Sequence, residues 1–222
     1  MWHKIKDYFK EHSRTEKKKL KEMTLKEKIG YIWEYYRMHI IGAVIVVIVA
    51  GSIINGIMNP PVPAYAGVAF YEIYLGENFE DILSRMMNEA LVEDTELEQV
   101  YVHSFLSGGD PSAEMALAQK LMAMLVVNEL DLIVAELEMI ENFITEDIFM
   151  PLAEAGFDVP EALAVYGVSN ENPERLAYAV NLGESVLRDH FRINTEALAI
   201  GIAVTTTRLD NAVAALGFLT IE

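Results

Sequence analysis

Two short polar loops contain the residues best suited to bind a ligand, and each follows an apolar segment typical of a β-strand. The first loop is Ser107, Gly108, Gly109 and Asp110, with Pro111 next. In open α/β sheets, ligands bind beyond the carboxyl ends of strands, and the amino end of a helix favours anions. Asp110 can also cap that helix with its own carboxylate. The loop therefore predicts either an anion site or a plain helix cap.

The second loop comprises Thr205, Thr206, Thr207 and Arg208, and we expect it at the same edge of the sheet. Its hydroxyls and guanidinium could contact a ligand, and the alternative is a solvated strand end. Glu136 closes a third apolar segment. Its carboxylate could meet a cationic group or simply be exposed.

No pattern of residues predicts catalysis or metal binding. Cysteine is absent, which excludes disulfides, thiolate nucleophiles and cysteine-ligated metals. The nucleophile elbow, the phosphate-binding loop and the dinucleotide-binding glycine motif are also absent. We therefore expect a non-enzymatic protein without cofactor or metal. The five histidines are scattered, with no two at metal-ligand spacing: His3, His12, His39, His103 and His190.

Methionine is frequent in the segments with helical periodicity. An unbranched thioether fills irregular gaps in a core, so we expect these side chains to be core filler. They are Met86, Met87, Met115, Met122 and Met124.

One apolar run, residues 38–58, is long enough to cross a bilayer. No charged residue occurs between Arg37 and Glu72, and a crossing needs about 20 mostly apolar residues. Thr24 and Glu27 have the spacing of a capping box, which predicts a helix that starts there and continues into the run. The run predicts one transmembrane helix, with the lipid bilayer as its partner.

Charge is distributed very unevenly about this run. Residues 1–37 hold 11 Lys/Arg and six Asp/Glu, whereas residues 38–222 hold six Lys/Arg and 28 Asp/Glu, a net −22. Lys and Arg near a crossing stay in the cytoplasm, so we expect a single-pass protein of the cell membrane with its amino terminus inside. The acidic excess argues against nucleic acid. Residues 1–22 are either an amphipathic helix on the inner leaflet or a cytoplasmic tail.

Prolines separate the apolar run from the rest of the chain. Residues 59–64 contain three prolines and predict a short stiff spacer. Ala64-Tyr65-Ala66 has the form of a signal-peptide cleavage site, so cleavage after Ala66 is the alternative to a permanent anchor. The apolar run is longer than a signal peptide requires, which favours the anchor.

Residues 65–222 alternate between strand and helix patterns, which predicts an α/β domain with a mainly parallel sheet flanked by helices. We expect strands over 66–75, 98–106, 131–136, 164–168, 178–181 and 198–207, and helices over 78–94, 111–128, 139–146, 184–191 and 209–219.

In this order of segments, the domain resembles the type II-like solute-binding (periplasmic-binding) protein fold. The resemblance rests on GGDPSAEMALAQKLMAMLVVNELDLIVAE, on FMPLAEAGF, which is similar to a hinge segment, and on LAIGIAVTTTRLDNAVAALGFL. With its KEKIGYIWEYYRMHIIG entry, the whole chain is also similar to single-pass membrane proteins of Gram-positive, clostridia-like bacteria. The resemblance implies an extracytoplasmic domain that captures or senses a small molecule or peptide. The alternative is a scaffold subunit of a membrane complex, with a membrane-protein partner and a degenerate cleft.

Overall fold

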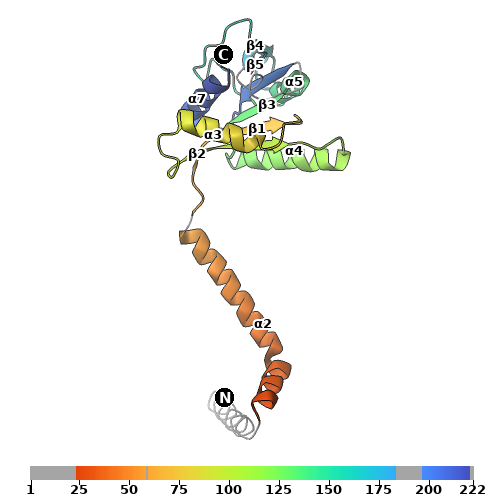
Figure 1. Ribbon diagram of the computed structural model, residues 1–222. Coiled ribbons are helices and arrows are strands. Elements are labelled where there is room, and N and C mark those ends of the chain that lie inside the picture. The colour runs from red at the N-terminus through yellow and green to blue at the C-terminus, as the bar shows by residue number, and fades with distance from the viewer. Residues whose placement is uncertain (1–23, 59, 184–196, 221–222) are drawn as a thin grey trace, which may run out of the picture. The chain divides into compact units, whose positions relative to one another are not determined.

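The computed structural model describes residues 24–58, 60–183 and 197–220 (Figure 1). The chain divides into two compact units, residues 1–61 and 62–222. The expected helix over residues 184–191 and the basic segment 1–22 lie outside the described residues.

In the described part of the first unit, residues 25–58 form one long helix, α2 (Leu25–Met58). Its start is the predicted capping box: the Thr24 hydroxyl donates to a Glu27 carboxylate oxygen at 2.8 Å, and the same oxygen accepts the Thr24 amide at 2.9 Å. Over Tyr36–Met58 the mean hydropathy is 2.6, and among the described residues this is the one helix long and apolar enough to cross a membrane. The predicted unbroken helix is confirmed.

The second unit is a six-stranded sheet with helices on both faces (Figure 1). The strand order is β2-β1-β3-β6-β5-β4. The strands are β1 (Ala64–Tyr71), β2 (Gln99–Phe105), β3 (Leu132–Glu136), β4 (Ala164–Gly167), β5 (Leu176–Asn181) and β6 (Leu198–Ile202). The helices are α3 (Phe79–Leu91), α4 (Pro111–Val126), α5 (Leu137–Thr145) and α7 (Leu209–Thr220).

The sheet is mixed, which corrects the expectation of a mainly parallel sheet. β1 pairs in parallel with β2 and β3, but β3–β6, β6–β5 and β5–β4 are antiparallel. The first three strands are joined by the crossover helices α3 and α4, which return the chain to the same edge and make neighbours parallel. After α5 the chain reaches β4 at the other edge of the sheet, and residues 168–175 then connect β4 to its antiparallel neighbour β5. The solute-binding fold itself stays a prediction.

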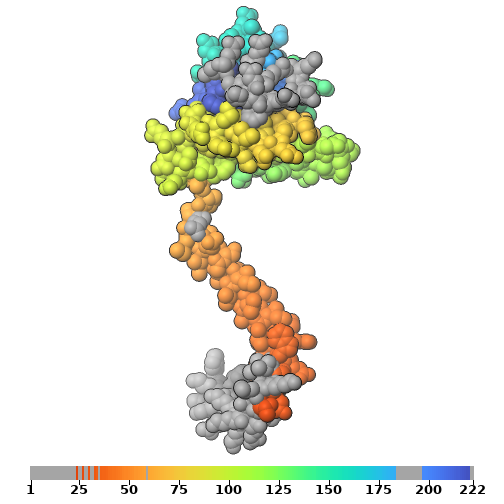
Figure 2. Space-filling view, viewed as in Figure 1, coloured from red at the N-terminus to blue at the C-terminus, as the bar shows by residue number. Residues whose placement is uncertain are grey.

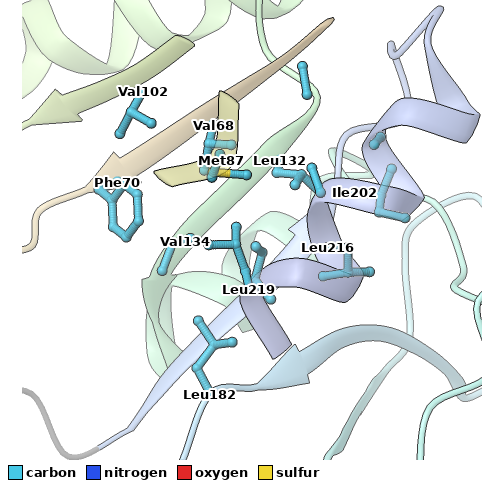
Figure 3. Close-up of a cluster of buried hydrophobic side chains, with 14 of the residues drawn as sticks. Val68, Phe70, Met87, Val102, Leu132, Val134, Leu182, Ile202, Leu216 and Leu219 are labelled. Atoms are coloured by element: carbon cyan, nitrogen blue, oxygen red, sulfur yellow. The ribbon is translucent and has the colours of Figure 1, made fainter. Parts of the chain in front are cut away.

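Two hydrophobic cores lie on opposite faces of the sheet, because alternate strand residues point to opposite sides. Val68, Leu132 and Ile202 face a core closed by α3 and α7, which Figure 3 shows with Met87 and Leu216. The other core is closed by α4 and α5. β1–α3–β2 moves toward one edge and β2–α4–β3 moves back across β1, so right-handed crossovers put α3 and α4 on opposite faces.

The boundary between spacer and domain lies inside a strand. Ala64 begins β1, and Ala66 is fully buried in the core of the α/β unit. Cleavage after Ala66 would therefore remove the first three residues of a central strand. This placement favours a retained anchor over a signal peptide.

Candidate functional site

The loop after β2 is held by the residue that follows β1. The carboxylate of Glu72 accepts the Ser107 amide at 3.1 Å and the Ser107 hydroxyl at 3.0 Å. The Glu72 amide in turn donates to the Phe105 carbonyl at 2.7 Å. Glu72 has a positive φ of 53°, which a non-glycine residue adopts only where surrounding contacts hold it. The polar groups of Ser107 are therefore used inside the protein.

Asp110 is the N-cap of α4, as the sequence predicts in one of its two interpretations. Its carboxylate accepts the Ser112 amide at 2.9 Å and the Ser112 hydroxyl at 2.7 Å. These hydrogen bonds hold the pKa of Asp110 below its usual value, because they stabilise the charged form. Gly108 and Gly109 have φ of 64° and 82°, the left-handed region that glycine enters without strain. An anionic ligand at this helix end would meet the Asp110 carboxylate.

Thr205, Thr206 and Arg208 lie at the opposite edge of the sheet from the Ser107–Asp110 loop, which corrects the expectation that both loops share an edge. β6 runs antiparallel to β3, so its carboxyl end meets the amino end of β3. The sequence pattern of an apolar strand does not reveal its direction. The two loops therefore cannot enclose one ligand.

At that opposite edge, the buried carboxylate of Asp131 binds residues of the Thr205–Arg208 loop. Asp131 is fully buried and forms an ion pair with Arg208, with 2.7 Å between guanidinium and carboxylate. The same carboxylate accepts the Thr206 hydroxyl and, at 2.8 Å, the amide of Gly67 in β1. Arg208 also donates to the Asn128 carbonyl at 2.7 Å. Asp131 thus joins β1, β3 and the loop after β6, a structural role that sequence reasoning missed.

Glu136 is exposed at the end of β3 and precedes α5 without capping it through its side chain. This position agrees with the second interpretation of Glu136, an exposed carboxylate at a strand end.

The Thr205 hydroxyl oxygen is buried and has no hydrogen-bond partner. Thr205 follows the end of β6 that pairs with the start of β3, next to Asp131, whereas Glu136 lies at the other end of β3.

A hollow of about 280 Å³ lies beyond the carboxyl ends of β1 and β2, at the amino end of α3. Its lining is mainly polar and includes two carboxylates: Leu75, Gly76, Asn78, Phe79, Glu80, Asp81 and Ser104. The Asn78 side chain does not cap α3. The sequence predicts this edge of the sheet but none of these residues, because the hollow arises from the path of the chain after β1.

α4 presents an apolar face to solvent. Leu121, Met124 and Leu125 enter the core, but Met115, Met122 and Val126 are 66%, 42% and 76% exposed. The sequence predicts core positions for all five named methionines. This is correct for Met87 and Met124, which are buried, and wrong for Met115 and Met122, whereas Met86 is half-buried. α4 has apolar residues on every side, so the sequence shows no single apolar face that would identify the buried side. Periodicity therefore could not distinguish its buried residues from its exposed ones.

Six exposed residues of α4 form one continuous stripe. Met115, Met122 and Val126 are separated by seven and four residues, a spacing that places them on the same side of a helix. Exposed Ala116, Gln119 and Ala123 continue that side. Figure 2 shows α4, in green, at the surface of the α/β unit. We call Met115, Met122, Val126 and these three residues the α4 stripe.

Within residues 24–58, 60–183 and 197–220, no group of three or more His, Asp or Glu side chains is arranged to hold a metal ion. No family model matches the chain, and neither the curated proteins nor the solved structures include a match. The resemblance to solute-binding proteins therefore stays a prediction.

Proposed function

We propose that this chain is a single-pass membrane protein whose α/β domain lies outside the cell membrane and docks another protein of a membrane complex. It does so without catalysis. The anchor is the apolar part of α2, Tyr36–Met58. The orientation follows from the excess of Lys and Arg in residues 1–37 and of Asp and Glu after the anchor.

The α4 stripe carries the proposal. The outward side of a surface helix in a soluble domain is normally polar or charged, whereas here Met115, Met122 and Val126 face solvent. The two charged residues of α4, Glu114 and Lys120, lie beside the stripe rather than in its centre. A contiguous exposed apolar surface of this kind is typical of an interaction site.

The polar loops favour docking over solute capture. Ser107 is bound by Glu72, Asp110 caps α4, and Arg208 is paired with Asp131. Each would have to give up a hydrogen bond within the protein to bind a solute, which costs about as much as the new contact contributes. We therefore prefer the scaffold hypothesis, in which the cleft of a solute-binding fold is degenerate.

Solute binding by a type II-like domain stays a prediction with its own test. Thermal unfolding of residues 62–222 can be measured with amino acids, peptides, polyamines and sugars. A ligand present at 100 times its Kd raises the free energy of unfolding by about 2.7 kcal/mol, a shift that such an assay detects. A ligand that stabilises the wild type but not a Glu80→Gln/Asp81→Asn variant would move the function to the hollow beside α3.

Position-specific photocrosslinking in cells tests the docking proposal. A photoreactive amino acid is placed at Met122, in the stripe, and at Glu89, an exposed position of α3. The proposal predicts one adduct of constant mass from position 122 and none from position 89. Absence of any adduct from position 122, or the same adducts from both positions, would refute it.

A further inference from the structure

We infer that the partner of the α4 stripe is an amphipathic helix with an apolar face and Lys or Arg at its ends. This rests on the proposed function, because it names the chemistry of what docks there. Three observations support the inference: the length of the stripe, the flexibility of its methionine side chains and the negative charge around it.

The stripe has the length of a helix-on-helix contact. Met115 and Val126 are 11 positions apart, which corresponds to about 16 Å or three turns of helix. Two methionines and one valine project from it, and alanines beside them leave room for a partner's side chains to enter. Flexible thioether side chains adapt to different apolar surfaces. A methionine-rich face can therefore pack against the apolar side of a helix without requiring one exact shape.

The charge around the stripe selects a cationic partner. Glu72, Asp110 and Glu114 stand at the amino end of α4, and exposed Glu129 follows its carboxyl end. Glu72 and Glu114 lie close enough to Tyr71 to raise its pKa, although burial of the phenol contributes more.

Lys120 is the one cation of α4, and it does not offset these carboxylates at the stripe. Lys120 is exposed, and its ammonium group stands 5.1 Å from the centre of the ring of Phe105, the last residue of β2. Four carboxylates therefore lie near the two ends of the stripe, whereas Lys120, the one cation of α4, stands over the Phe105 ring.

A second copy of the chain fits this surface less well. Residues 38–222 carry a net −22, so pairing two copies through α4 would bring two strongly acidic domains together. Like charges placed opposite one another weaken association, whereas Lys or Arg near the four carboxylates strengthens it. The same sign of charge disfavours an anionic lipid surface.

The test uses the full chain in nanodiscs of neutral phosphatidylcholine, with empty nanodiscs subtracted. The probe is a fluorescent synthetic helix of about 18 residues, or five turns, with a leucine face and lysines at both ends. The reference is the same helix with glutamates in place of the lysines. We expect the lysine helix to bind at least about tenfold more tightly than the glutamate helix, and this ratio to fall as salt is added.

Substitutions in the stripe give the second readout. Met122→Lys, or Val126→Lys as an independent replacement, should weaken the lysine helix about tenfold. Glu89→Gln on α3 changes the net charge by the same single unit and should leave binding unchanged. Both stripe side chains are exposed, and thermal unfolding of each variant verifies that it remains folded.

The outcomes separate this inference from the proposed function. Equal binding of both helices, or binding that Met122→Lys does not weaken, overturns the basic-helix inference. If the photocrosslink from position 122 is still found, docking stands with a partner of other chemistry. If that adduct is a second copy of this chain, the occupant is the chain itself and the inference is wrong. If no adduct forms and neither helix binds, both proposals fail.

Discussion

Replacing Arg208 with leucine should destabilise the α/β domain far more than an ordinary surface substitution. The guanidinium is about one-quarter exposed, but its partner Asp131 is fully buried. The substitution would leave a buried carboxylate without a counter-charge, and breaking such a pair costs about 3–5 kcal/mol. Asp131 would keep the Gly67 amide and the Thr206 hydroxyl as donors, so we expect a loss near the lower limit, about 3 kcal/mol.

Urea unfolding of residues 62–222, followed by circular dichroism, measures this loss directly. Fluorescence is less suitable, because both tryptophans, Trp2 and Trp33, precede this unit. Arg175→Leu is the matched control: Arg175 is exposed and stands over the Tyr166 ring, so its loss should cost no more than about 1 kcal/mol.

A double-mutant cycle identifies the ion pair as the cause. Asp131→Asn keeps an acceptor for the Gly67 amide but removes the charge. If the charge pair matters, combining Asp131→Asn with Arg208→Leu should cost less than the sum of the single changes, by about 1–3 kcal/mol. The reasoning is refuted if Arg208→Leu costs no more than Arg175→Leu, or if the two effects simply add.

Two further predictions concern close packing and pH. Gly67→Ala should destabilise the domain by about 3 kcal/mol, since the new methyl would meet the backbone carbonyl of Glu129, whereas Gly76→Ala, with open space around it, should cost much less in the same urea assay. Burial, followed by the charge of Lys120, lowers the pKa of His103 in the folded domain. The imidazole therefore binds a proton more readily in the unfolded chain, and the domain loses stability as pH falls below about 6.5. His103→Gln should remove that part of the loss, so its melting temperature should fall less than that of the wild type between pH 7.5 and 5.5, and an equal fall in both would contradict this.

Local patterns in the sequence predicted most elements of the fold but not the way they pair. The capping residues Thr24 and Asp110 predicted the starts of α2 and α4, because a cap involves only neighbouring residues. Strand direction depends on contacts far apart in the sequence, so the antiparallel pairing of β6 with β3 was not predicted. The expected placement of Thr206 and Arg208 was wrong for the same reason.

The candidate site was harder to predict than the fold. Asp131 and Arg208 are 77 residues apart, and neither position differs in the sequence from an ordinary surface charge. The α4 stripe was missed because Met115 and Met122 look the same in sequence as buried Met124. What separates them is which side of α4 packs against the core, and this depends on tertiary contacts. The sequence did contain one indication of the stripe: α4 has more apolar residues than one buried face of a helix requires.

Labelling of single cysteines in intact cells tests the central claim most directly. The chain has no cysteine of its own, so Met122→Cys and Glu89→Cys each introduce one thiol. A membrane-impermeant maleimide should label position 89 at once, because the domain lies outside, and should label position 122 only after the protein is purified, because a partner covers the α4 stripe. Equal, rapid labelling of both in intact cells would contradict docking, and labelling of neither until the cells are opened would contradict the orientation.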